Sequence, residues 1–425
     1  KNSALIFSAA TSSSLATLSY SDYINITPGA TYNYAVAAYD AAGNISGQAI
    51  ISINTPPLPS TSPSSSPSSS PTPSPSATTA TIPHNCGAPI NVPQDTPLIQ
   101  IAVNSACIGD TIYVAAGFYD ENITITKSSL TLKGAPGTKP EQVIIDGGGR
   151  GDAVYIKKMS TNFVIDGFTL QNASGLGGVP GGAGLSINLS SLEGGDFNAG
   201  NMIARNLIVT NNSYGIYLWN IRSGSVTLER SVIHNNLYNG IDPSSVFLSG
   251  QVIMTNNTVV NNGRSGYYDW AGGGSRTFRN NIFANNGSYG IYSHKDTIKS
   301  ISYNNLWNNT KGNYCNADAY GNCITSSTPS PGTGELSVDP RFVSTSDYHL
   351  QFGSAMINAG DPATTDPDGS RADMGAYPSG SVITQADTTP PTISNIQAAA
   401  SSTAVTITWG TDEAADTQVE YGVSS

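Results

Sequence analysis

Asparagine pairs recur along the middle of this chain at a nearly constant period. The pairs begin at Asn211, Asn235, Asn261, Asn285 and Asn308, at spacings of 24, 26, 24 and 23 residues. A glycine follows each pair, at Gly215, Gly240, Gly266, Gly290 and Gly312. An apolar residue precedes each pair by two positions, at Val209, Ile233, Val259, Phe283 and Leu306. A repeat of this length is typical of a solenoid, in which each repeat contacts only its neighbours.

The segments between the pairs have the composition of short strands. Runs such as 226–228, 252–254 and 301–303 are rich in β-branched, aromatic or other apolar residues and are bounded by Asn, Ser and Gly. About three such strands fit in a repeat of ~24 residues, which predicts a parallel β-helix with coils ~4.8 Å apart. Asparagine tolerates the left-handed backbone of a turn, and its amide can bond the coil above and below. We therefore interpret the pairs as structural.

Composition narrows the class of protein. The chain has 425 residues, which predicts several domains. Only 11% of residues are charged, and the formal net charge is −11. This balance argues against nucleic acid and anionic membranes as partners. No apolar run approaches the ~18 residues of a membrane span, so we expect no membrane insertion.

The four cysteines fall into two local pairs. Cys86 and Cys107 flank the start of the predicted solenoid, and Cys315 and Cys323 lie near its end. Local pairing predicts two disulfides and an extracellular or cell-surface protein, the alternative being four free thiols. No Cys/His cluster has the spacing of a metal site.

Both ends of the chain resemble parts of fibronectin type III domains. Residues 1–55 contain Pro28-Gly29-Ala30-Thr31-Tyr32, which resembles the tyrosine corner of such a domain, and its opening strands are expected to be missing. Residues 391–425 resemble the first strands of a second domain, with Trp409 as its core tryptophan. A Ser/Pro-rich linker at 56–82 and a shorter linker at 379–390 separate these fragments from the solenoid. The chain thus reads as part of a longer modular parent chain, whose other domains would be partners.

Residues 83–378 resemble bacterial right-handed parallel β-helix proteins of the pectate-lyase-like superfamily. The resemblance rests on the opening segments 99–103, 109–114 and 117–121, and on the terminal segments 339–342, 348–350, 355–361 and 366–377. It implies an all-β fold, with a short helix at about Thr96 to Ala106 that covers the open end of the core.

A candidate binding surface follows from counting along the strand after each repeat glycine. If the first residue after the glycine fills the core, the second and fourth point outward. This places aromatic side chains of successive coils on one face, which predicts an exposed glycan-binding platform. Its residues are Tyr217, Trp219, Tyr268, Trp270 and Tyr292. The alternative is that these rings support insertion loops.

Polar residues beside this platform are the candidates for catalysis. We name Lys295 or His294 as a base and Asp269 or Asp242 as an acid or cation ligand, with Arg264 and Arg276 as further substrate-binding residues. The motifs of polygalacturonases and of one pectate lyase group are absent, and Lys295 also fits a solvated turn. Four aspartates of the terminal segment, Asp361, Asp366, Asp368 and Asp373, include an Asp-x-Asp-Gly sequence that resembles part of a calcium loop. Calcium is the one candidate cofactor, and ordinary turn chemistry with Arg371 as counter-ion is the alternative.

Three functions fit these features. The first is a secreted or cell-surface modular protein that binds polysaccharide along the aromatic groove. The second is a polysaccharide lyase or glycoside hydrolase of the same superfamily, and the third is a non-enzymatic adhesin or stalk. The missing catalytic motifs favour the first.

Overall fold

The computed structural model of the protein describes residues 17–22, 29–39, 45–56, 81–157, 161–175, 181–189, 198–243, 250–270, 273–294, 297–318, 321–323, 332–378, 390–401, 405–411 and 416–423. The chain divides into two units. One comprises Lys1–Ser74, Val343–Asp347 and Ile383–Ser425, and the other comprises Pro75–Phe342 and Tyr348–Val382. Most residues of the two predicted linkers, 57–80 and 379–389, lie outside the described residues.

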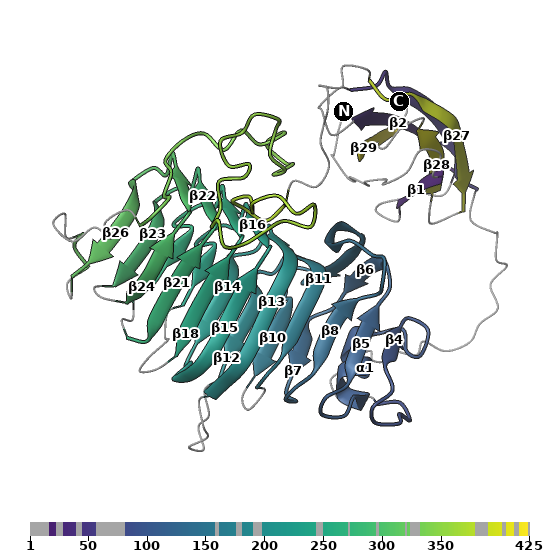
Figure 1. Cartoon of the computed structure of the whole chain (residues 1–425). Coiled ribbons are helices and arrows are strands. Elements are labelled where there is room, and N and C mark those ends of the chain that lie inside the picture. The colour runs from purple at the N-terminus through teal and green to yellow at the C-terminus, as the bar shows by residue number, and fades with distance from the viewer. Residues whose placement is uncertain are drawn as a thin grey trace. The chain divides into compact units, whose positions relative to one another are not determined.

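The larger unit is the predicted all-β, right-handed parallel β-helix (Figure 1). One of its faces is a sheet of parallel strands stacked coil on coil. In stacking order, the strands are β26 (Gly312–Ala317), β23 (Tyr289–His294), β20 (Tyr267–Tyr268), β17 (Ile241–Asp242), β14 (Tyr214–Trp219), β12 (Ala183–Asn188), β10 (Val154–Lys157) and β7 (Ile123–Ile125). We call its outer surface the aromatic face, after the residues named below.

The other faces of the coils belong to one larger parallel sheet that bends at a corner. Its main path is β24 (Ile298–Ser302), β21 (Ser275–Arg279), β18 (Gln251–Thr255), β15 (Ser223–Glu229), β13 (Asn198–Thr210), β11 (Val164–Gln171), β8 (Thr131–Gly134), β5 (Thr111–Val114) and β4 (Ile90–Val92). Beyond the corner lie β25 (Asn305–Trp307), β22 (Ile282–Ala284), β19 (Thr258–Val260), β16 (Val232–His234), β9 (Val143–Asp146) and β6 (Gly117–Asp120). β11 and β13 run through the corner, where Gly167 and Asn206 adopt left-handed backbone (φ 85° and 51°).

The repeat predicted from the sequence forms the core. Val209, Ile233, Val259, Phe283 and Leu306 align as partners on successive strands, and all five are buried. The inward ladder is therefore confirmed. The first asparagine of each pair adopts left-handed backbone, and the second turns inward. From Asn212 to Asn309 the inward asparagines form a continuous chain, in which each side-chain amide donates to the side-chain oxygen of the next, at 2.9–3.1 Å.

A short helix covers the first coils, as predicted. Helix α1 spans Ile99–Ser105, and its first two backbone N–H groups donate to the carboxylate of Glu121, at 2.8 and 3.0 Å. The side-chain amide of Gln100 exchanges two hydrogen bonds with the backbone of Thr124 in the edge strand β7. The helix therefore satisfies the strand edge that the first coil would otherwise leave open. A single turn of 3₁₀ helix, η1 (Pro140–Gln142), lies before β9.

The terminal segment, residues 336–342 and 348–377, packs on the outer surface of β16, β19 and β22. Tyr348, Met356, Met374 and Ala376 join Val232, Val260 and Ile282 in a second apolar cluster. Two backbone N–H groups fix the segment against the coils: that of Gly375 donates to Asn280 O, and that of Ala376 donates to Thr258 Oγ1. The segment thus covers apolar strands beyond the corner and leaves the aromatic face to other residues.

The smaller unit is a pair of three-stranded antiparallel sheets built from both chain ends. One sheet is β1 (Thr17–Asp22), β28 (Val405–Thr411) and β27 (Ile393–Ala400), and the other is β29 (Asp416–Val423), β2 (Thr31–Tyr39) and β3 (Ala49–Asn54). The two end fragments expected from the sequence therefore pair with each other. Tyr34, Ile407 and Trp409 are fully buried in their shared core, Trp409 as expected.

Both predicted disulfides are present. Cys86 bonds to Cys107 and Cys315 to Cys323, with S–S distances of 1.97 and 1.93 Å. Among the helices of the described residues, none is long and apolar enough to cross a membrane.

Candidate functional site

One outward row of side chains crosses the aromatic face along the helix axis. Strand register aligns Tyr155, Ser186, Tyr217 and Asp242 on consecutive coils, and the row continues through Tyr268 and Tyr292. The residues that follow the repeat glycines directly (Ile216, Ile241, Tyr267 and Ile291) are fully buried. The inward direction assumed from the sequence for these residues is therefore confirmed.

The aromatic residues form two stacked groups on this face. In the first, the rings of Tyr217 and Trp219 stack with centroids 6.0 Å apart and planes 13° apart, and Tyr214 packs edge-on against Tyr217. In the second, Tyr268 and Tyr292 on adjacent coils stack at 4.7 Å. Asp242 lies between the two groups in the row. Two aromatic patches thus flank one carboxylate.

The exposure predicted for these rings is correct for only part of the set. Trp270 is 50% exposed, and Trp219 and Tyr268 are partly exposed. Tyr217 and Tyr292, in contrast, retain only 8% and 6% exposure, so the prediction that they are exposed is wrong. Each is covered by rings of its own group.

The loop closed by the second disulfide also covers part of this face. The hydroxyl of Tyr292 donates to Gly321 O at 3.1 Å, and Cys315 packs against the Tyr292 ring. Gly321 lies so close to Trp270 that a Cβ there would approach the indole ring to 2.7 Å. The disulfide therefore holds a glycine turn against the aromatic face and leaves the Trp270 ring half exposed.

Asp242 and Arg264 are charged groups whose charges act on a tyrosine of each aromatic group, Tyr214 and Tyr268. The side-chain amide of Asn239 donates to Asp242 Oδ2 at 2.8 Å, and Asp242 is buried. The exposed Arg264 places its guanidinium 4.7 Å from the ring centre of Tyr238, which itself packs on Tyr214. The Tyr214 side of this surface was not predicted from the sequence, although Tyr214 and Tyr289 both directly precede a repeat glycine.

The tyrosines of this face are held in the protonated form. Burial, followed by the nearby charge of Asp242, raises the pKa of both Tyr214 and Tyr268. Burial raises the pKa of Tyr292 to about 12. These phenols are therefore hydrogen-bond donors at neutral pH and poor general bases. Nearer the first coils, burial raises the pKa of the Asp152 carboxyl to about 6, although the N–H groups of Gly182 and Ala183 oppose it.

Two predicted site residues belong to the interior instead. Arg276 Nε donates to Asp269 Oδ2 at 2.8 Å, and both side chains are fully buried (0% exposed). Arg276 aligns with Val252 in an inward row, and Asp269 stands third after its glycine, which is an inward position. Their assignment to the polar edge of a groove is therefore corrected. The alternation counted from Gly266 already predicts an inward side chain at Asp269.

The remaining candidates are not gathered into a site. His294 ends β23 at a partly exposed position, and Lys295 lies outside the described residues. Asp361 pairs with Arg279, Asp368 accepts from its own turn, and Asp373 and Asp366 accept backbone N–H groups. The four aspartates are not among the described groups of three ligands within 4.8 Å of one another. The group that does meet this distance is His84, Cys107 and Asp110, and its cysteine is in a disulfide.

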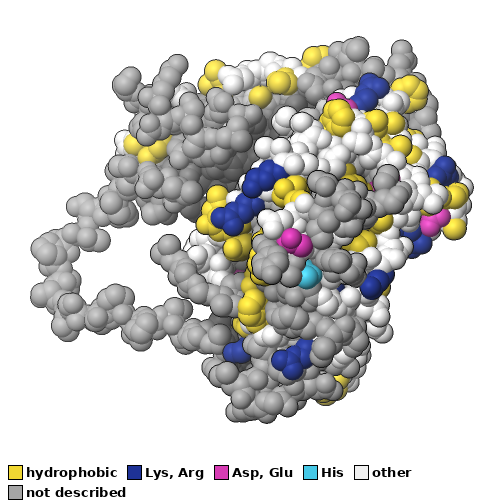
Figure 2. All heavy atoms as spheres, turned by 90° about the vertical axis from the view of Figure 1, so that its left-hand side faces the viewer, with side chains coloured by type: hydrophobic (Ala, Val, Ile, Leu, Met, Phe, Trp, Pro, Cys, Tyr) yellow, Lys and Arg dark blue, Asp and Glu magenta, His cyan; other side chains and the backbone are white. Residues whose placement is uncertain are grey.

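Charged side chains are sparse in this chain. On the face shown in Figure 2, Lys and Arg side chains are scattered among uncharged atoms, in keeping with the 11% charged composition.

Comparison with known proteins adds structural neighbours. No protein-family model matches the sequence, and no curated protein matches it by sequence. Among solved structures, pectate lyase Pel9A is similar at 14% identity, over 66% of this chain and 90% of that chain, with a TM-score of 0.42. A pectin methylesterase in complex with a hexasaccharide is similar at 13% identity, over 69% and 99% of the two chains, with a TM-score of 0.36. Pectin methylesterase PemA from Erwinia chrysanthemi is similar at 13% identity, over 64% and 95%, also with a TM-score of 0.36. The class of protein that the coils themselves define is the parallel β-helix.

Proposed function

We propose that the β-helix binds a polysaccharide along its aromatic face. The observation that carries this proposal is the pair of stacked groups, Tyr217 with Trp219 and Tyr268 with Tyr292, set in register along the helix axis on either side of Asp242. Coils ~4.8 Å apart repeat at close to the length of one pyranose unit, so successive coils can meet successive sugars. Trp270 offers the largest exposed aromatic surface of the set.

The polar groups of the face suit sugar hydroxyls. The protonated tyrosines donate hydrogen bonds, and the buried Asp242 carboxylate accepts them. The guanidinium of Arg264 supplies donors beside Tyr238. Apolar ring faces with a few directed polar groups are the usual composition of a carbohydrate site.

Binding without catalysis is the function that these residues favour. A hydrolase needs two carboxylates about 5–10 Å apart across the scissile bond. Asp269, the predicted partner of Asp242, faces the core and is neutralised by Arg276. A lyase needs a base, and the described tyrosines of the face have raised pKa values. Enzyme function through His294 or Lys295, and a stalk-like adhesin, are the alternatives that the experiment below separates.

Location outside the cell is part of the same proposal. Two disulfides close local loops of the solenoid, and disulfides persist in oxidising compartments.

The experiment is a polysaccharide panel read in three ways: retention of the protein, new ultraviolet absorbance from unsaturated uronates, and new reducing ends. We expect retention by at least one glycan. Trp270→Ala and Trp219→Ala should each weaken it by about 1–3 kcal/mol with little change in melting temperature. Phe352→Ala is the matched control, because Phe352 is an exposed aromatic residue of the terminal segment.

Unchanged retention in the Trp219→Ala/Trp270→Ala double variant would reject the aromatic face as the binding site. New absorbance would assign a lyase, and reducing ends without it a hydrolase. No retention of the native protein by any glycan would favour the adhesin or stalk.

A further inference from the structure

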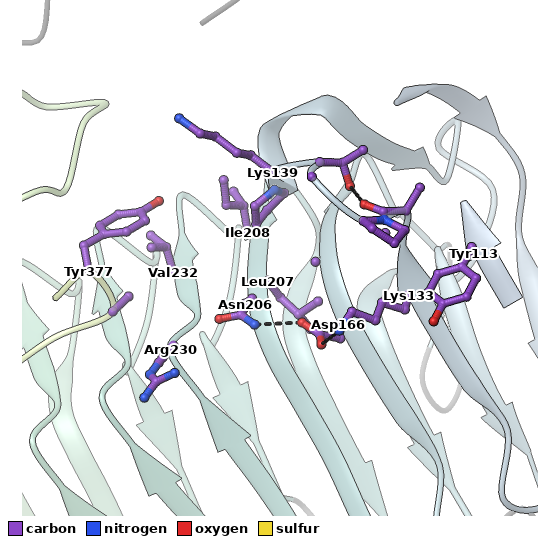
Figure 3. A pocket seen from close by; sticks show the side chains of 18 of the residues that line it. Tyr113, Lys133, Lys139, Asp166, Asn206, Leu207, Ile208, Arg230, Val232 and Tyr377 are labelled. Atoms are coloured by element: carbon purple, nitrogen blue, oxygen red, sulfur yellow. Dashed lines mark hydrogen bonds and ion pairs between the residues drawn. The ribbon is translucent and has the colours of Figure 1, made fainter. Parts of the chain in front are cut away.

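A second concave site lies at the corner of the coils, away from the aromatic face. It is a cavity of about 550 Å³ at the corner through which β11 and β13 run, beside the end of β8, and one wall is the terminal segment (Figure 3). That volume is within the usual range for a small-molecule site, about 300–1,000 Å³. Its principal lining side chains are Tyr113, Lys133, Asp166, Asn206, Arg230 and Tyr377.

The cavity has an excess of positive charge in a chain whose net charge is −11. Lys133, Lys139 and Arg230 line it, and Asp166 is the only carboxylate among its described lining residues. That carboxylate is already neutralised, since it lies 3.2 Å from Lys133 Nζ and 3.1 Å from Arg205 Nε. Although burial opposes ionisation, hydrogen bonds from Asn206 and Lys133 and the charge of Arg205 hold the pKa of Asp166 below its usual range. Asp166 therefore holds the side chains of Lys133 and Asn206 in place, and the remaining charge of the cavity lining is positive.

Arg230 is the cation available to a ligand. Its side chain is exposed, and within the described part of the chain its guanidinium makes no hydrogen bond or ion pair, although its charge acts on Asp366. Its backbone is left-handed, with φ 45°. Register places it between Asn206 and Asn256, which adopt the same conformation with φ 51° and 54°. Asparagine suits this conformation better than arginine, so the turn itself does not call for the guanidinium.

The walls offer aromatic and apolar surface. In Figure 3, Tyr377 and Tyr113 lie at opposite sides of the cavity, with Arg230 below Tyr377 and Lys133 beside Tyr113. Ile208 and Val232 lie between them, and Lys139 extends away at the upper rim. Tyr377 stacks on His349, with ring centres 3.8 Å apart, which fixes the orientation of its ring. The cavity thus combines aromatic walls, of which Tyr377 is held by stacking, with a guanidinium that has no hydrogen bond or ion pair within the described residues.

We infer that this corner cavity binds an anionic saccharide, a pyranose-sized sugar that carries a carboxylate or sulfate. The guanidinium of Arg230 would take the oxyanion, because its planar fork matches two oxygens of such a group. Lys133 would add a second positive charge, and Tyr113 and Tyr377 would contact the ring. The site does not depend on the aromatic face and differs from it in requiring charge on the sugar.

The test is isothermal titration of the whole chain with glucuronate, glucose 6-sulfate, glucose and inorganic sulfate. We expect one or both anionic sugars to bind, at an affinity that falls with added salt, and glucose to show no binding. The key variant is Arg230→Asn. Asparagine adopts the same left-handed backbone in the neighbouring coils, so this variant removes the charge without straining the turn. It should weaken anionic sugar binding by about tenfold or more. Lys311→Gln is the control for net charge, since Lys311 is exposed and does not line the cavity.

The outcomes separate this inference from the proposed function. Loss of binding in Arg230→Asn, together with full binding in Lys311→Gln and Trp270→Ala, would support the corner cavity. The response to the two anionic sugars would tell carboxylate from sulfate recognition. Equal affinity in Arg230→Asn and the native chain would overturn the inference, and so would glucose binding as tightly as glucuronate. Inorganic sulfate binding as tightly as the sulfated sugar would also overturn it, because the saccharide would then contribute nothing.

Discussion

Glu335 ends a chain of buried asparagines by accepting two hydrogen bonds from Asn304. Its Oε1 lies 2.9 Å from the backbone nitrogen and 2.8 Å from the side-chain amide of Asn304. Behind Asn304, Asn281 and Asn257 hydrogen-bond in the same pattern, back to Ser231. The carboxylate occupies the place where the next coil would have supplied another asparagine oxygen. It therefore satisfies the last rung of a ladder that would otherwise end in unpaired donors.

Replacement of Glu335 should destabilise the last coils. Glu335→Ala leaves the backbone N–H of Asn304 without its acceptor and removes one of three acceptors of the Asn304 side-chain amide, which should cost about 1–3 kcal/mol. Glu335→Gln retains an acceptor oxygen and should cost less. Urea unfolding followed by circular dichroism measures both. Equal stability of Glu335→Ala and the native chain would show that solvent replaces the carboxylate.

Ile233 tests the inward ladder of the repeat. Ile233 is fully buried between Val209 and Val259, so Ile233→Ala should leave a cavity that costs about 2–4 kcal/mol. Ile253→Ala is the matched control, because Ile253 lies on β18 in the next coil and is only partly buried. Equal losses of unfolding free energy in the two variants would contradict the distinction between inward and outward positions.

The sequence predicted the coil because its signals are periodic. The ladder at Val209 and Ile233 and the two disulfides follow from repeat spacing and local pairing, which need no knowledge of distant contacts. The capping helix follows instead from the resemblance of the opening segments to β-helix proteins. The second ladder, formed by Asn257, Asn281 and Asn304, was not predicted, although Asn256-Asn257 and Asn304-Asn305 are visible pairs in the sequence. In its first coil the position is occupied by Ser231, which interrupts the asparagine repeat.

The site was less predictable, because burial depends on contacts that the repeat does not encode. Alternation gave the outward direction of Tyr217 and Tyr292, but rings in the same row and the loop at Gly321 cover them. The corner cavity is lined both by Tyr113 of an early coil and by Tyr377 of the terminal segment. Neither sequence segment contains a local pattern that predicts their contact.

His234 should make the docking of the terminal segment sensitive to acid. Its ring packs against Tyr348, at 4.9 Å between centroids, and burial lowers the pKa of His234 to about 4. The unfolded histidine titrates near 6.5, so the unfolded state binds more protons between these values. Stability should therefore be complete above pH 6.5 and fall as the pH drops towards 4, by up to about 3 kcal/mol.

Hydrogen exchange of residues 348–377 as a function of pH measures this effect. The glutamine of His234→Gln cannot be protonated, so this variant should lose the destabilisation that the native chain shows as the pH falls from 6.5 to 4, whatever its absolute stability. Asp366, whose pKa is raised to about 6, titrates in both chains. A variant with the same pH profile as the native chain would assign the acid response to the carboxylates instead.

The ion pair of Arg276 and Asp269 should be costly to break and cheap to replace. Both side chains are fully buried, and Tyr267 and Asp269 raise the pKa of Arg276 although burial opposes its charge. Asp269→Leu leaves a buried unpaired guanidinium and should cost about 3–5 kcal/mol, as should Arg276→Met with the carboxylate unpaired. The double variant carries no buried charge and should recover most of the loss, because apolar residues of similar size can fill the same volume.

Arg279→Met on the same strand is the control for this prediction, since the Arg279–Asp361 pair is partly exposed and should contribute at most about 1 kcal/mol. Unfolding free energies of the four variants form the measurement. If the two single losses simply add in the double variant, the charges do not depend on each other. The pair would then contribute to the coil through its separate hydrogen bonds, such as that from Arg276 to Ser275 O.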